Sequence, residues 1–160
     1  MRLYLMRHGV AIDRDDPDCP SEAERFLTPK GVERTREAAE GLAEMGIAPA
    51  VLLTSPYVRA VQTGEIFCEV LGIDSQNLHA TDALKPEAKP GKIAEELERL
   101  TFDEAICFGH APHLDDFIAY ALRASAPVTT LKKAGVACLD VHTFSPPAAQ
   151  FRWLLTPRLL

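Results

Sequence analysis

The sequence predicts an α/β fold in which helices cover a mostly parallel sheet. Short apolar runs alternate with amphipathic stretches of helical length along nearly the whole chain, the pattern typical of strand–helix–strand units. Several apolar runs end abruptly at glycine or at Ser-Pro, as buried strands do when they lead into loops. Because 160 residues hold no internal repeat and no linker-like tract, we expect one domain covering residues 1–160.

The first third of the chain predicts a strand, a loop and a helix. Arg2–Met6 is apolar and ends at a charged pair followed by glycine, which indicates a buried strand. Asp13–Ser21 is polar, contains two prolines and predicts a loop. Thr28 precedes proline, so it is expected to be the N-cap of a helix that runs to about Met45, with Gly46 after its end.

The middle of the chain repeats this order. Val51–Thr54 predicts a second strand, which Ser-Pro closes, and a helix is expected from about Tyr57 to Leu71. Gly72 suits the C-terminal end of that helix. Leu78–Thr81 predicts a third short strand.

The remaining elements complete the sheet. A helix is expected to begin at Pro90, and Ala105–Phe108 predicts a buried strand that ends in Gly-His. Leu114–Leu122 predicts a further helix. Val136–Val141 and Phe151–Leu155 predict strands that close the sheet.

Composition narrows the class of protein. The apolar fraction of 47% and the charged fraction of 25% are ordinary for a globular chain. A net charge of −6 argues against a nucleic-acid partner, which requires a basic surface. No apolar run is long enough to span a bilayer, and the N-terminus has too short an apolar stretch for a signal peptide. We therefore expect a cytoplasmic protein with no membrane partner.

The four cysteines do not predict a disulfide framework. They are widely spaced and form no C-x-x-C pair. Three lie in apolar stretches, where a free cysteine packs as a small hydrophobic residue, and one lies in the polar loop, where exposure is expected. The three in apolar stretches are Cys68, Cys107 and Cys138, and the one in the polar loop is Cys19.

Reactive side chains follow three of the predicted strands. Arg7 and His8 follow the first strand, Arg59 lies one turn beyond the second, and His110 follows the strand at Ala105–Phe108. Ligands of open α/β sheets bind beyond the carboxyl ends of the strands. If these strands are parallel, two histidines and two arginines meet at one edge of the sheet.

Such a group of residues suits phosphoryl transfer. The planar fork of an arginine matches phosphate oxygens and stays charged at any useful pH. A neutral imidazole is a competent nucleophile towards phosphorus, and nearby arginines disfavour its protonated form. Glycine at position 9 would let the backbone approach the phosphate closely.

Three motifs together resemble the histidine phosphatase superfamily. They are RHG at residues 7–9, SPYVRAVQT at residues 55–63 and GH at residues 109–110. Within that superfamily, the short length resembles SixA-type phosphohistidine phosphatases. So do LTPKG at residues 27–31, LKP at residues 84–86 and KKAGVACLDV at residues 132–141.

The resemblance implies a three-layer α/β/α sandwich and a covalent mechanism without cofactor or metal. It implies that His8 carries the phosphoryl group during turnover, while Arg7, Arg59 and His110 form the phosphate pocket. Gly9 joins that pocket. Two departures stand out: Gly64 replaces the alanine of the second motif, and Ala111 leaves a polar position near the pocket unfilled.

The class of substrate depends on the leaving group. An alcohol leaving a phosphomonoester needs a general acid, whereas the imidazole of phosphohistidine needs less help. In the mutase and monoesterase branches of the superfamily, an acidic residue after the third strand supplies the proton. In this chain the corresponding region contains Asp82 and Glu87, and Glu87 is the candidate acid. The chain has little sequence for a lid, so an open site for phosphohistidine on a protein is expected. A small-molecule phosphomonoesterase or phosphoglycerate mutase-like enzyme is the alternative.

Two rival functions use other features. His110, His113, Asp115 and Asp116 form H-x-x-H-x-D-D, whose residue types suit zinc or iron, although a turn from strand to helix makes them diverge. A non-catalytic module that binds a phosphorylated partner would use the same arginines. A nucleophile beside the cations argues against such a module, because binding alone does not require one.

Overall fold

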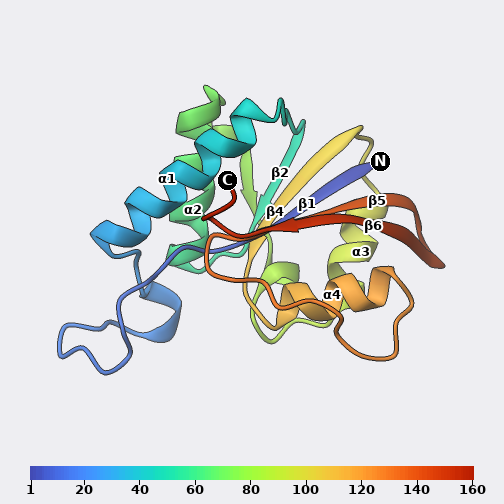
Figure 1. Cartoon of the computed structure of the whole chain (residues 1–160). Helices are drawn as coiled ribbons and strands as arrows, with labels where there is room; N and C mark the ends of the chain where they lie inside the picture. The colour runs from blue at the N-terminus through green and yellow to red at the C-terminus, as the bar shows by residue number, and fades with distance from the viewer.

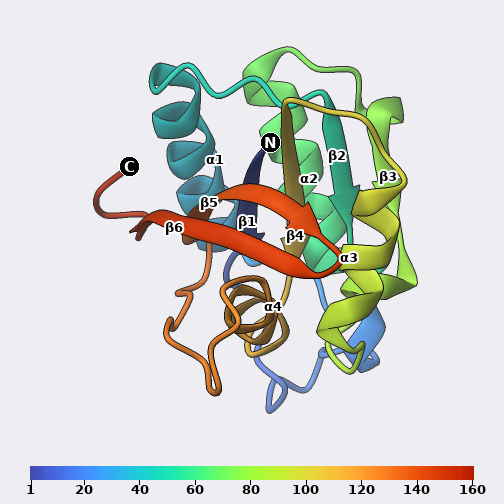
Figure 2. The same cartoon turned by 90° about the vertical axis from the view of Figure 1, so that its right-hand side faces the viewer.

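A computed structural model describes all 160 residues, and in it the chain forms a six-stranded sheet between two layers of helices (Figures 1 and 2). The strands lie in the spatial order β3-β2-β4-β1-β5-β6. The first four are parallel, and β5 and β6 are antiparallel to their neighbours, which confirms a mostly parallel sheet. The strands are β1 (Arg2–Arg7), β2 (Val51–Thr54), β3 (Leu78–Ala80), β4 (Glu104–Gly109), β5 (Val136–Phe144) and β6 (Pro147–Leu155).

Helices pack on both faces, so the expected three-layer sandwich is confirmed. One core cluster joins the sheet to α1 and α2, and the other joins it to α3 and α4. Figure 2 shows α3 and α4 on the side of the sheet opposite α1. The helices are α1 (Pro29–Glu44), α2 (Val58–Leu71), α3 (Pro90–Glu98) and α4 (His113–Ala121), with short 3-10 turns η1 (Glu22–Glu24), η2 (Ser75–Asn77) and η3 (Asp82–Leu84).

The continuously apolar sequence of β1 follows from its central position in the sheet. Leu3 and Leu5 belong to the cluster under α3 and α4, whereas Tyr4 and Met6 belong to the cluster under α1 and α2. Since successive side chains of a strand point to opposite faces, a central strand covered on both sides has no face left for polar residues.

Local signals place the ends of α1 and α2. Thr28 accepts a hydrogen bond from the Gly31 amide at 3.0 Å, and proline occupies the first turn, as expected. Gly46 and Gly72 have φ of 76° and 67°, which places both in the left-handed region that other residues rarely adopt. Gly72 is the C-cap of α2, and Gly46 follows the C-cap residue of α1.

The C-terminal hairpin is longer than the sequence predicted. Strand β5 continues to Phe144, beyond the expected end at Val141, and β6 begins at Pro147, before the expected start at Phe151. The connecting stretch contains two prolines and reads as a loop. The structure tolerates proline there because β6 is an edge strand that pairs on one side only.

The strand directions bring several loops to one edge. In the register of β1 and β4, Arg7 lies opposite Gly109, so both strands end together. Antiparallel β5 starts at this edge, since Val136 lies opposite Met6. The loops after β1, β2 and β4 and the loop before β5 therefore surround one region.

None of the helices is both long enough and apolar enough to cross a membrane. Cys68, Cys107 and Cys138 are buried as free thiols, as expected from their apolar surroundings, and Cys19 is half-buried.

Candidate active site

The four side chains that the sequence selected meet at this edge of the sheet. Arg7 ends β1 and His8 follows it, Arg59 lies in the first turn of α2, and His110 follows β4. The imidazole centroids of His8 and His110 are 5.1 Å apart, and Arg59 Nε lies 3.3 Å from His8 Nε2. All four line one cavity of about 290 Å³. The predicted convergence of two histidines and two arginines is therefore present.

The hydrogen bonds of His8 determine its tautomer. Its Nδ1 lies 2.7 Å from the Gly9 carbonyl oxygen, which can only accept a hydrogen bond, so Nδ1 carries the proton. Its Nε2 faces Arg59 Nε–H, which can only donate, so Nε2 presents a lone pair. The ring is therefore a neutral imidazole whose unprotonated nitrogen faces the arginine.

Burial and charge keep that ring neutral. His8 is 6% exposed, and burial is the largest influence that lowers its pKa, to about 3. The positive charges of Arg59, Arg7 and Lys133 lower it further, against the opposing hydrogen bond to Gly9. At neutral pH Nε2 is therefore unprotonated, and its lone pair accepts the hydrogen bond from Arg59.

Arg59 is fixed from three directions. Its Nη1 donates to the Glu22 carbonyl oxygen at 2.7 Å and its Nη2 to the Glu22 carboxylate at 3.0 Å. Its Cζ lies 5.2 Å from the centroid of the Tyr57 ring. The guanidinium is thus held with Nε against His8 Nε2, and the side chain is only 3% exposed.

Ser55 positions the second histidine. Ser55 Oγ accepts a hydrogen bond from the Tyr57 amide at 3.3 Å and forms a second one with His110 Nε2 at 2.8 Å. His110 Nδ1 is buried and has no partner in the protein. Burial first, and then the electrostatic interactions with His8 and with the Arg59 guanidinium, lower the pKa of His110 to about 2. His110 is thus neutral at neutral pH.

Arg7 reaches the site from the end of β1. Its Nη1 donates to the Leu131 carbonyl oxygen at 2.9 Å, and its Nε is buried without a partner. No carboxylate forms an ion pair with it, so its positive charge remains available to an anion.

The sequence did not reveal that the loop after β1 supplies one wall of the cavity. The Glu22 carboxylate lies 2.7 Å from Arg14, 3.1 Å from Arg25 and 3.0 Å from Arg59. The hydrogen bond from Arg14, followed by the charges of Arg25 and Arg59, lowers the pKa of Glu22 to about 2 against the opposing effect of burial. Alternating acidic and basic residues in a polar loop read as solvated surface, so the sequence alone gives no signal for this network.

Tyr57 and Lys133 also line the cavity and were not selected from the sequence. Each lies inside a motif that resembles the superfamily. Tyr57 stands between Ser-Pro and Arg59, and Lys133 stands in the KKAG segment. Their place in those motifs was the available signal.

The two candidate acids separate in the structure. Glu87 is exposed and lines the cavity. Asp82 does not line it, because its carboxylate pairs with Lys85 at 3.1 Å and lies beside a different hollow next to α3.

Gly9 does not line the cavity either, and its small size serves packing. Its amide donates to Thr63 Oγ1 at 3.1 Å, and a Cβ at this position would collide with Thr35 Oγ1 on α1. Close contact between the loop and α1 thus requires a glycine here, and approach of the backbone to a phosphate stays a prediction. Gly64 is similar, since a Cβ there would lie 2.7 Å from a methyl group of Leu78.

The alternative metal set does not assemble. Asp115 is turned towards the segment before β5, where it accepts from Thr129 Oγ1 at 2.7 Å and from the Leu131 amide at 3.0 Å. His113 is buried and neither ring nitrogen has a partner. The structure contains no group of three or more His, Cys, Asp or Glu side chains that could hold a metal ion.

Comparison with known proteins gives a consistent result. Residues 3–104 match the family model described as histidine phosphatase superfamily (branch 1). An uncharacterised protein of Picosynechococcus sp. is 36% identical over 141 residues, which cover 85% of this chain and 82% of that protein. Phosphohistidine phosphatase SixA of Escherichia coli is 28% identical over 134 residues, covering 79% of this chain and 78% of that protein. A structure of the protein histidine phosphatase SixA in complex with tungstate superposes with a TM-score of 0.87 at 25% identity, covering 99% of this chain and 98% of the other.

Proposed function

Because the chain belongs to the histidine phosphatase superfamily, we propose that it hydrolyses phosphohistidine on proteins through a phosphohistidine intermediate on His8. The observation that carries this proposal is the state of His8. Its Nε2 is unprotonated and accepts a hydrogen bond from a buried guanidinium at 3.3 Å, at the wall of a cavity that holds a second neutral histidine.

The proposed reaction has two steps. The lone pair of His8 Nε2 attacks phosphorus, the P–N bond of the substrate breaks, and the departing imidazole takes its proton from solvent. A water molecule then attacks the phosphoryl group on His8, the second P–N bond breaks, and inorganic phosphate leaves. The electron pair returns to Nε2, so the enzyme regains its neutral starting form.

Three side chains would stabilise the transferring group. Its charge spreads over the equatorial oxygens, where fixed donors lower the barrier. Arg7 and Arg59 supply positive charge from two sides of the cavity. In the tautomer that carries its proton on Nδ1, the ring nitrogen with no partner in the protein, His110 would donate to a phosphoryl oxygen. All three are set by the fold before substrate arrives, which is the arrangement that electrostatic catalysis needs.

The size of the cavity and the exposure of Glu87 favour phosphohistidine as the substrate. A volume of about 290 Å³ accommodates a phosphoryl group and the ring that bears it, with the rest of the substrate outside. Glu87 is exposed. Such an exposed position suits a carboxylate that does not have to protonate a buried alcohol. Resemblance to SixA of Escherichia coli supports the same substrate.

Hydrolysis of small phosphomonoesters is the second candidate, and the position of Glu87 favours it. This carboxylate lines the cavity that holds His8, so it lies where a general acid for an alcohol leaving group is needed.

The experiment compares phosphate release from a phosphohistidine peptide and from a simple phosphomonoester. The wild type, His8→Ala and Glu87→Gln are assayed side by side. We expect preference for the peptide, complete loss of activity in His8→Ala and little change in Glu87→Gln. Turnover of the monoester that equals or exceeds that of the peptide, and that depends on Glu87, supports the second candidate instead. Activity that survives in His8→Ala overturns the mechanism for both.

A further inference from the structure

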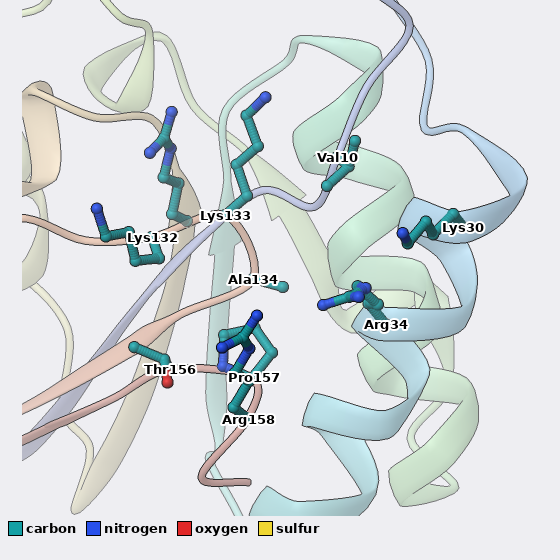
Figure 3. Close-up of a pocket in the computed structure, with 10 residues that line it drawn as sticks. Val10, Lys30, Arg34, Lys132, Lys133, Ala134, Thr156, Pro157 and Arg158 are labelled. Carbon is teal, nitrogen blue, oxygen red and sulfur yellow. The ribbon is translucent and has the colours of Figure 1, made fainter.

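A larger cavity lies next to the catalytic one, and its walls are basic. It has a volume of about 760 Å³ and lies between α1, the segment before β5 and the segment after β6 (Figure 3). No acidic residue lines it. Its six basic residues are Arg7, Lys30, Arg34, Lys132, Lys133 and Arg158.

Three of these side chains face the cavity from opposite walls. Lys30 and Arg34 are four residues apart on α1, so they lie on the same side of that helix. Arg158 comes from the segment after β6. Figure 3 shows the guanidinium groups of Arg34 and Arg158 reaching into the space between the two walls, with Lys30 beside Arg34.

These positive charges form no ion pairs within the protein, although Asp115 acts on Arg7 and Asp13 on Lys133 from a greater distance. The nine ion pairs of the structure involve none of the six residues. The chain has 17 Lys and Arg residues and a net charge of −6, so more than a third of its cations gather in one cavity of an acidic protein. Burial and then the charges of Arg7 and Arg25 lower the pKa of Lys133, and Arg7 lines the same cavity as Lys133. An anion in the cavity would relieve the repulsion between these two cations.

We propose that this cavity is a second anion-binding site, which takes a compact polyanion of the oligophosphate class. The volume lies within the range of small-molecule sites. Arginine forks on two walls match phosphate oxygens, and several cations within one cavity require a ligand with several negative charges. The site goes beyond the proposed phosphatase activity and does not depend on it.

The surroundings favour a compact ligand over an acidic segment of another protein. Glu33 and Glu37 of α1 line the adjoining hollow, together with the outer sides of Arg34 and Arg158. On the other side, Asp13 acts on Lys133 as a nearby negative charge. An extended acidic chain that left the cavity in either direction would meet carboxylates, whereas an oligophosphate held inside it would not.

The cavity communicates with the catalytic one through Arg7 and Lys133, which line both. A polyanion that draws on these two cations lowers the positive potential available to the substrate phosphoryl group. We therefore expect tripolyphosphate to raise the KM for substrate.

The test measures binding of tripolyphosphate by calorimetry while orthovanadate occupies the catalytic cavity and prevents turnover. Arg34→Gln combined with Arg158→Gln removes two cations of the site, and neither residue lines the catalytic cavity. The matched control removes two arginines elsewhere, Arg36→Gln, whose partner is Glu69, and Arg99→Gln, which lies next to α3. The control changes net charge equally but leaves the cavity intact.

We expect tripolyphosphate to bind the vanadate-bound wild type and the control equally. It should bind the cavity variant about a hundredfold more weakly, since each charge-assisted contact is worth roughly tenfold in affinity. Vanadate affinity should stay the same in all three. Loss of tripolyphosphate binding whenever vanadate is present, or equal affinity in the cavity variant, overturns the proposal. A glutamate-rich peptide that binds the cavity more tightly than tripolyphosphate overturns the oligophosphate assignment in favour of an acidic protein segment.

Discussion

Replacing Arg59 by alanine should slow the chemical step. The structure places Arg59 Nε 3.3 Å from His8 Nε2, while the other two nitrogens of the guanidinium are occupied by Glu22. A side chain that is 3% exposed acts in a medium where charge is weakly screened. Loss of one fixed electrostatic donor in such a site lowers kcat by about 10²–10³, or roughly 3–4 kcal/mol of transition-state stabilisation.

The difficulty with Arg59→Ala is that it also removes a contact to the loop after β1. Glu22→Gln provides the control, because it removes the carboxylate from Arg59 and leaves the guanidinium beside His8. Since Glu22 is 44% exposed, its ion pairs contribute little stability, and Glu22→Gln should leave kcat within a fewfold of the wild type.

Steady-state phosphate release gives kcat and KM separately for each variant, and thermal unfolding shows that each is folded. We expect a large fall in kcat for Arg59→Ala and not for Glu22→Gln. A rise in KM with unchanged kcat would refute it, because Arg59 would then bind the substrate and the transition state equally. An equal fall in kcat for Glu22→Gln would also refute it, since the loop would then be responsible.

Other predictions test the remaining parts of the site and fold. His8→Ala should release no phosphate from any substrate, and recovery of wild-type turnover in that variant contradicts the covalent step. Chelation by EDTA should leave activity unchanged; inactivation that a specific metal restores would revive a role for a metal. The pKa values of His8 and His110 are about 3 and 2 in the folded protein, against 6.5 when unfolded, so the unfolded chain binds more protons below pH 6.5 and stability falls as the pH drops. Between pH 7 and pH 5 urea denaturation should show a loss of about 2 kcal/mol for each of these histidines, and replacement of His110 by asparagine should remove its share. Thr28→Ala should lower the free energy of unfolding by about 1 kcal/mol through loss of the cap on α1, which thermal and urea unfolding would detect.

Much of the fold could be predicted from local sequence because each signal is local. Buried parallel strands are short apolar runs, and β1, β2 and β4 follow that rule. The caps at Thr28 and Gly72 involve residues within one turn of the helix end. The hairpin of β5 and β6 was underestimated because an edge strand carries no such pattern: β6 is half-exposed along its length and tolerates proline.

The residues of the candidate site also differ in whether a local sequence pattern predicts their position. His8, Arg59 and His110 lie directly after strands or in the first turn of a helix, so the topology alone brings them together. Glu22 and Arg25 lie in a long loop whose path depends on contacts with α2, and no local pattern reports those contacts. Arg34 and Arg158 belong to separate ends of the chain and meet only in the folded protein.

The pairing of β1 with β4 has a consequence for how such a protein can diverge. His8 and His110 each follow one of these hydrogen-bonded neighbours, and their rings lie 5.1 Å apart, close to the spacing of about 4.8 Å between adjacent strands. The distance between the two histidines is thus inherited from the sheet and not from the loops around it. The exposed stretch at residues 13–18 can therefore be lengthened, shortened or exchanged, by evolution or by an engineer, while the spacing of the two rings stays constant.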